Sequence, residues 1–206
     1  MFLLLSDVES VLIPEIWVEI SEKLGIKELA ITSREIPDFE RLMRYRIEML
    51  KKYGIKFGEL ERIARALKPL PYAKTFLKNI SMHIPVILVS GAPYELLCPV
   101  LKKLGSYSLI ANNFIIKNGE VDGFKFRIRE DKENVVRFFK KLNYRVIGIG
   151  DSFNDISMLN CCEYAFLLNP SEEVKRRCQK AGFKGKIASS LKEIEREIKC
   201  YLKLYF

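Results

Sequence analysis

Apolar runs of four or five residues recur along the chain, separated by longer stretches whose apolar positions follow helical spacing. Runs this short are typical of buried strands. A hairpin is expected where residues 114–116 and 123–126 flank Asn118-Gly119, because Asn-Gly favours the tight turn between antiparallel strands. Strands that alternate with helices predict an α/β fold, with a Rossmann-like parallel sheet and helices on both faces. The strands predicted for this sheet are residues 2–6, 86–89, 146–149 and 164–168.

The first two strands are separated by a long insert, residues 14–70, which contains three helical stretches and little strand character. An insert placed directly after the first strand can form a lid over the end of the sheet. We therefore expect two parts, a small helical cap of residues 14–70 and an α/β core made of residues 1–13 and 71–206.

Two carboxylates, Asp7 and Glu9, follow the first predicted strand and are two residues apart, so they point to the same side. One carboxylate can attack a phosphorus atom and form an acyl-phosphate. The other can protonate the leaving oxygen and then take a proton from water. A Mg²⁺ ion would offset the repulsion between these carboxylates and a phosphate. The alternative is that both acids cap the next turn.

A second acidic segment, Gly150-Asp151-Ser152-Phe153-Asn154-Asp155, follows the strand at 146–149. Because the carboxyl ends of parallel strands share one edge of a sheet, Asp7, Glu9 and Asp151 can surround one cation. Ser152 can also cap a helix, with Asp155 three residues later. Both interpretations can hold, since a cap and a ligand use different residues of one turn.

Two further features suit a phosphate. Ser90-Gly91 ends the strand at 86–89, where a hydroxyl and backbone N–H groups face a turn. Lys132 begins an amphipathic helix expected over 131–142, with Asp131 as its N-cap, and a cation there opposes the helix dipole unless an anion binds. The alternatives are an ordinary turn and a solvated lysine.

Arg46 lies in the apolar stripe of a helix expected over 38–53, formed by Phe39, Leu42, Met43, Leu50 and Tyr53. A guanidinium there needs a partner, because an unpaired buried charge is costly. It either makes an internal ion pair, extends its head to solvent, or binds the carboxylate of a ligand.

Composition narrows the class of protein. Hydrophobic residues make up 49% and charged residues 30% of 206 residues, as in a globular protein. No apolar stretch approaches the roughly 18 residues of a membrane span, so no membrane association is expected. Five irregularly spaced cysteines favour reduced thiols and a cytoplasmic location. The net charge of +9 is scattered rather than clustered with aromatics, so nucleic-acid binding is the less favoured, non-enzymatic alternative.

The order of these motifs resembles the four motifs of the haloacid-dehalogenase-like phosphatases, and most closely the phosphoserine phosphatases. Within them it is similar to the group that also transfers phosphate to homoserine, whose sequences continue as Val11-Leu12-Ile13-Pro14-Glu15-Ile16-Trp17 does here. Three positions depart from the usual pattern: Glu9 where the superfamily has Asp, Ser10 where the group has Gly, and Gly91 where it has Asp.

The resemblance implies Mg²⁺-dependent hydrolysis of phosphoserine in serine biosynthesis, with transfer to homoserine or hydrolysis of another small phosphate ester as alternatives. It implies Asp7 as nucleophile and Glu9 as general acid and base. The metal would be held by Asp7, the Glu9 carbonyl and Asp151. Substrate would be bound by Glu15 at its ammonium, by Arg46 at its carboxylate, and by Ser90, Gly91, Lys132 and Asn154. The apolar tail from Tyr201 is expected to pack on the domain or on a partner, as in a homodimer.

Overall fold

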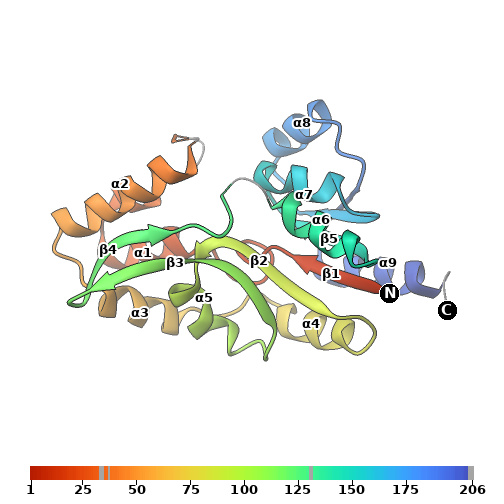
Figure 1. Ribbon diagram of the computed structural model, residues 1–206, viewed down its shortest axis with the longest axis horizontal. Coiled ribbons are helices and arrows are strands. Elements are labelled where there is room, and N and C mark those ends of the chain that lie inside the picture. Colours follow the sequence, from red (N-terminus) through yellow and green to blue (C-terminus); the bar gives the residue numbers. More distant parts are fainter. Residues whose placement is uncertain (33–34, 37, 130–131, 204–206) are drawn as a thin grey trace.

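A computed structural model describes residues 1–32, 35–36, 38–129 and 132–203 (Figure 1). In these residues the strands form one seven-stranded sheet in the order β4-β3-β2-β1-β5-β6-β7. All neighbouring strands are parallel except the β3–β4 hairpin. The strands are β1 (Phe2–Ser6), β2 (Val86–Pro93), β3 (Ser108–Lys117), β4 (Glu120–Lys125), β5 (Arg145–Gly150), β6 (Tyr164–Leu168) and β7 (Lys186–Ala188).

The central strand β1 is buried on both faces, which is why it reads as an unbroken apolar run. Phe2 and Leu4 face one hydrophobic cluster, and Leu3 and Leu5 face the other. The first cluster is covered by α4 (Ala73–Ser81), α5 (Tyr94–Leu101) and α9 (Leu191–Lys203). The second is covered by α6 (Glu133–Lys141), α7 (Ile156–Asn160) and α8 (Glu172–Lys180), above the sheet in Figure 1. The predicted α/β sheet with helices on both faces is confirmed.

The insert between β1 and α4 is helical, as expected. It contains α1 (Ile16–Leu24), the 3₁₀ helix η1 (Lys27–Ala30), α2 (Phe39–Lys52) and α3 (Phe57–Ala66). Helix α2 contacts the β4 strand of the hairpin (Figure 1). Phe39 packs edge-to-face on Phe124 and Phe126 at 6.3 and 6.0 Å. The insert therefore rests on the hairpin of the core and shares its hydrophobic cluster.

Several boundaries differ from the sequence-based expectations. Strand β3 begins at Ser108, because it first pairs in parallel with β2 and only then turns back into the hairpin. Strand β7 was not predicted, and its three residues are too few for a periodic signal. Tyr53, expected in the buried stripe of α2, is 43% exposed. Asp131, the expected N-cap, and residues 204–206 of the tail lie outside the described residues.

Within the described part of the chain, no helix has both the length and the apolar character needed to cross a bilayer.

Candidate active site

The loop after β1 holds Asp7 at the carboxyl edge of the sheet. The Asp7 backbone N–H donates to the Ile149 carbonyl at 2.9 Å, which fixes the loop to β5. The Val8 carbonyl then accepts from the N–H groups of Leu12 at 2.8 Å and Ile13 at 3.2 Å. This tight turn leaves Asp7 buried, with 7% of its surface exposed.

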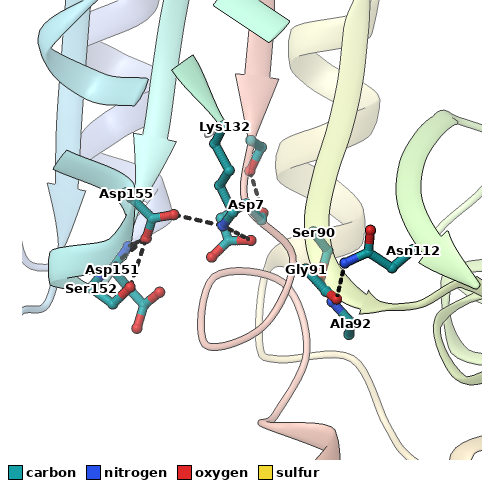
Figure 2. Close-up of polar contacts among 10 residues, drawn as sticks. Asp7, Ser90, Gly91, Ala92, Asn112, Lys132, Asp151, Ser152 and Asp155 are labelled. Carbon is teal, nitrogen blue, oxygen red and sulfur yellow. Dashed lines mark hydrogen bonds and ion pairs between the residues drawn. The ribbon is translucent and has the colours of Figure 1, made fainter. Parts of the chain in front are cut away.

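Lys132 joins two carboxylates across the site. Its ammonium lies 3.0 Å from Asp7 Oδ1 and 2.7 Å from Asp155 Oδ1, as Figure 2 shows. Lys132 is 8% exposed, so the alternative of a solvated lysine is wrong. The charge at the start of α6 is stabilised by these two carboxylates, which outweigh the opposing helix dipole.

Asp155 is fully buried and orders the loop after β5. Its Oδ2 accepts from the backbone N–H groups of Asp151 and Ser152, both at 3.1 Å, and from the Ser152 hydroxyl at 3.0 Å. The reach of Asp155 back to Ser152 is the contact that the capping interpretation predicts. Gly150 allows this approach, because a Cβ there would lie 2.4 Å from Asp155 Cβ.

Burial and charge shift the ionisation of these groups. Burial, together with Asp155, raises the pKa of Asp7 to about 7 against the opposing effect of Lys132. Burial, Asp155 and Asp7 raise the pKa of Asp151 to about 9. For Lys132, burial lowers the pKa, but Asp155 and Asp7 together raise it above its ordinary value. A nearby positive charge favours the ionised form of carboxylates that lie this close together.

The site has the donors of a hard cation. Oxygen atoms of Asp7, Asp151 and Asp155 all lie within 4.8 Å of one another. Both Asp155 oxygens already accept hydrogen bonds, and Asp7 Oδ1 is paired with Lys132. The second oxygen of Asp7 and the Asp151 carboxylate are therefore better placed to bind a cation directly. Carboxylate ligands suit Mg²⁺, which keeps several of its waters. The acidic group can therefore hold a divalent cation.

Ser90 and Gly91 face Asp7 from the other side (Figure 2). The sequence predicted that the strand ends before them in a turn, but β2 continues through both to Pro93, with a shift of its register to β3 between Ser90 and Pro93. Ser90 is 1% exposed, and its Oγ accepts from the Ala92 N–H at 3.1 Å. A Cβ at Gly91 would lie 3.2 Å from the ring of Phe39, the first residue of α2. A residue of the insert therefore touches the predicted phosphate turn.

Glu9 lies at the junction of this loop with α1. Its Oε1 accepts from the Ile16 N–H at 2.9 Å, at the first residue of the helix. Burial raises the Glu9 pKa, while the Ile16 N–H and Arg46 oppose the shift. Glu15, the N-cap residue, is exposed, and its Oε1 accepts from the Ser10 hydroxyl at 3.3 Å. Glu9 thus makes a helix-capping contact, and its raised pKa also suits a proton donor.

Arg46 is buried on α2, with 7% of its surface exposed. Its Nη2 donates to the Ile31 carbonyl at 2.7 Å, and its Cζ lies 4.6 Å from the centre of the Trp17 ring. Among the described residues, no carboxylate lies within ion-pair distance of it, and Arg46 Nε has no partner. Burial lowers its pKa to about 10, while Glu9 and Glu15 partly offset that effect.

The structure thus brings together Asp7, Lys132, Asp151 and Asp155, with Ser90 and Gly91 opposite. Arg46 and Glu15 interact electrostatically with Glu9 from the insert. Asn154, in η2 (Phe153–Asp155), is exposed.

Comparison with known proteins identifies the family. The sequence model of the haloacid dehalogenase-like hydrolases matches residues 15–160. The chain is also 37% identical to phosphoserine phosphatase ThrH of Pseudomonas aeruginosa over 171 residues, which cover 82% of this chain and 83% of that protein. The chain belongs to the haloacid dehalogenase-like hydrolase family.

Solved structures agree with this haloacid dehalogenase-like fold. A substrate-bound phosphoserine phosphatase superposes with a TM-score of 0.78 at 22% identity, over 95% of this chain and 97% of that one. A phospho-aspartyl intermediate analogue of a phosphoserine phosphatase gives a TM-score of 0.76 at 22% identity, over 95% and 98% of the two chains. At this identity the likeness establishes the shared fold.

One supporting residue of this haloacid dehalogenase-like site was missed from the sequence. Asn112, on β3, is fully buried. Its Nδ2 donates to the carbonyls of Gly91 and Ile128, both at 2.8 Å, and its Oδ1 accepts from the N–H groups of Arg127 and Ile128. Asn112 therefore fixes β2 at Gly91 relative to the segment that leads to Lys132. Asn112 precedes the strand predicted at 114–116, and no pattern in the sequence marked it as a site residue.

Proposed function

We propose that this protein hydrolyses O-phospho-L-serine to serine and phosphate in the cytoplasm, in a Mg²⁺-dependent reaction through an aspartyl-phosphate. The observation that carries the proposal is the buried Asp7–Lys132–Asp155 arrangement beside Asp151. The names of the relatives support phosphoserine as the substrate. The five unpaired cysteines support a reducing compartment.

In the first half-reaction, one Asp7 oxygen attacks phosphorus and the P–O bond to serine breaks. The bonding pair leaves with the serine oxygen, which takes a proton from Glu9. The raised pKa of Glu9 supports its role as the acid. Lys132 beside Asp7 stabilises the negative charge of the incoming phosphoryl group.

In the second half-reaction, water attacks the same phosphorus atom while Glu9 takes its proton. The bond between phosphorus and the Asp7 oxygen breaks, which releases phosphate and restores the carboxylate. Ser90 and the backbone around Gly91 are placed to bind the phosphoryl oxygens. Asn154, which is exposed in η2 after β5, would also bind substrate.

Asp7, Asp151 and the Glu9 carbonyl would hold Mg²⁺, and Asp155 would orient the loop that carries Asp151. When bound, Mg²⁺ supplies positive charge against the phosphoryl oxygens and the crowded carboxylates. The raised pKa values of Asp7 and Asp151 support a cation at this position.

Substrate choice would come from the insert, residues 14–70, acting as a cap over the core of residues 1–13 and 71–206. Arg46 is a buried cation without a carboxylate partner in the described residues, so a substrate carboxylate would complete its environment. Glu15 is exposed at the N-terminus of α1 and would pair with the substrate ammonium.

The test is phosphate release from phosphoserine, phosphothreonine, phosphoethanolamine and sugar phosphates, with and without Mg²⁺. We expect phosphoserine to be preferred and Mg²⁺ to be required. Adding homoserine and following phosphohomoserine distinguishes transfer from hydrolysis. Equal rates on all esters would contradict phosphoserine as the substrate, and absence of phosphate release from any ester would contradict the enzyme assignment. Size-exclusion chromatography with light scattering would decide whether the protein is a homodimer.

A further inference from the structure

Trp17 contacts Arg46, the residue of the proposed substrate site that would bind the carboxylate of the amino acid. It is the second residue of α1, is 4% exposed, and lies beneath the Arg46 guanidinium, whose Cζ is 4.6 Å from its ring centre. The ring also packs edge-to-face with Phe114 on β3, at 6.3 Å and 84°. A rigid aromatic face therefore supports a buried cation.

The other contacts of Arg46 are too few to fix the orientation of its guanidinium without the Trp17 ring. The Ile31 carbonyl accepts from Nη2 at 2.7 Å. Within the part of the chain that the structure describes, Nη1 contacts only the weak sulfur acceptor of Met43, at 3.8 Å. Nε has no partner, and no carboxylate of the described residues forms an ion pair with the guanidinium. Stacking on an aromatic face is favourable for a desolvated guanidinium, and it fixes the plane in which the donors of the guanidinium lie.

We propose that Trp17 is a specificity-determining positioning residue, which holds the Arg46 guanidinium in the plane that receives the carboxylate of the substrate. This inference rests on the proposed phosphoserine phosphatase activity. Trp17 acts through Arg46, so its effect depends on the presence of both the arginine and a substrate carboxylate.

Two substitutions separate the ring face from the bulk of the side chain. Trp17→Phe keeps an aromatic face and Trp17→Leu does not. We expect Trp17→Leu to lower kcat/KM for phosphoserine by on the order of 10-fold, mainly through KM, and Trp17→Phe to lower it by less than about 3-fold. p-Nitrophenyl phosphate, which lacks a carboxylate, should be turned over with less than about a 2-fold change.

A double-mutant cycle shows whether the effect passes through Arg46. In an Arg46→Ala background, Trp17→Leu should cause no further loss of phosphoserine selectivity. A loss that persists in that background, equal losses on both substrates, equal losses for the Phe and Leu variants, or no loss at all would each overturn the proposal.

The protein carries its own spectroscopic probe, because Trp17 is the only tryptophan in the chain. In an Asp7→Asn background, which blocks turnover, phosphoserine should change the Trp17 emission and phosphoethanolamine, which lacks only the carboxylate, should not. The change should vanish in Asp7→Asn/Arg46→Ala. Independently of any substrate, Arg46→Ala should itself shift the emission of Trp17.

The two hypotheses fail in different ways. If the wild-type protein hydrolyses phosphoserine no better than phosphoethanolamine, the proposed substrate is wrong. If phosphoserine is preferred but Arg46→Ala leaves the Trp17 emission unchanged, the positioning role of Trp17 is wrong.

Discussion

At the scale of single residues, Lys132 compensates the negative charges of the buried carboxylates in the site. It is shared by Asp7 at 3.0 Å and Asp155 at 2.7 Å, and all three residues are less than 9% exposed. Removing one member of a buried ion pair leaves the other charge uncompensated, which costs about 3–5 kcal/mol. The residue is therefore needed for the order of the site, in addition to the phosphate-binding role that we propose for it.

Asp7→Asn is expected to abolish turnover and to leave the fold intact. The amide keeps the shape of the side chain but is a far weaker nucleophile and a poorer cation ligand. Phosphate release should fall by at least about 10³-fold while the circular dichroism spectrum stays unchanged. Near-normal release by the purified variant would remove Asp7 from the mechanism.

Arg46→Ala is expected to act on one class of substrate. Its loss leaves the carboxylate of phosphoserine buried without a partner, which costs on the order of 1–3 kcal/mol or more. Parallel kcat/KM measurements on phosphoserine and p-nitrophenyl phosphate should show a strong loss only on the first. A folding defect would lower both together, and equal losses would contradict the assignment of Arg46.

At the scale of elements, the close packing of β5 against the loop that follows it determines where Asp151 and Asp155 lie. A Cβ at Gly150 would meet Asp155 at 2.4 Å, and one at Gly148 would lie 2.6 Å from Cys162 Sγ. The strand therefore needs glycine at both positions so that η2 and α7 can pack directly on it.

Gly150→Ala should destabilise the protein by more than about 2 kcal/mol and remove most activity, because Asp155 must move away from Lys132. Gly58→Ala is the matched control. Gly58 lies in α3, and nothing is within 4 Å of the Cβ that alanine would add. That variant should be more stable by about 0.5–1 kcal/mol, because alanine favours the helix. Urea unfolding measures the stability of both variants, and phosphate release measures their activity. A stable, active Gly150→Ala protein would contradict the close packing of Asp155 on Gly150.

Glu195 joins α9 to α4 on the opposite face of the sheet. It is 6% exposed and accepts from the Tyr72 hydroxyl at 2.9 Å, Asn79 Nδ2 at 3.0 Å and Lys199 Nζ at 2.6 Å. Burial raises the pKa of Glu195, but the combined effect of these three donors is larger and lowers the pKa below its ordinary value of 4.5. The carboxylate is thus a stabilising link only while it is ionised.

Glu195→Ala should lower the free energy of unfolding by about 1–3 kcal/mol near neutral pH. A depressed pKa in the folded state means that the contribution is complete above the unfolded-state value and is lost as the pH falls through the folded-state value. The difference in the free energy of unfolding between wild type and variant, measured from urea unfolding curves, should therefore decrease below about pH 4.5. If this difference in the free energy of unfolding stays constant with pH, the charge of Glu195 does not contribute to stability.

At the scale of the whole molecule, parallel strand ends bring together four segments that are far apart in sequence. Asp7 follows β1, Ser90 and Gly91 lie in the C-terminal half of β2, Asp151 follows β5, and Lys132 precedes α6. The central order β2-β1-β5 places these ends side by side at one edge of the sheet. The insert then supplies Glu15 and Arg46 from α1 and α2.

Hydrolysis should stop when divalent cations are chelated and return when Mg²⁺ is added back. The oxygen donors of Asp7 and Asp151 suit a hard cation. Their pKa values are raised first by burial and then by the neighbouring carboxylates, and a cation would favour the ionised form of both groups. Added Mg²⁺ should also raise the Tm of the chelated protein. Full activity after exhaustive chelation would contradict a metal-dependent site.

The sequence alone was enough to predict what depends on local pattern. Strands β1 and β6 match their predicted ranges, because a strand buried on both faces is an unbroken apolar run. The hairpin turn at Asn118-Gly119 was predicted from the preference of these residues for positive φ, which is 50° and 77° here. The acids after β1 and β5 were identified because they follow such runs directly.

Only the tertiary structure decided how these residues interact. Lys132 was singled out at the start of its predicted helix, but the choice between an anion-binding lysine and a solvated one was open until the fold placed it between Asp7 and Asp155. Asn112 and Trp17 gave no periodic signal of their own, since their partners lie on other elements. Arg46 could be found in an apolar stripe, but the choice between an ion pair, solvent and a ligand required its surroundings. Contacts between distant segments depend on the packing of the whole chain, and a local pattern does not contain that information.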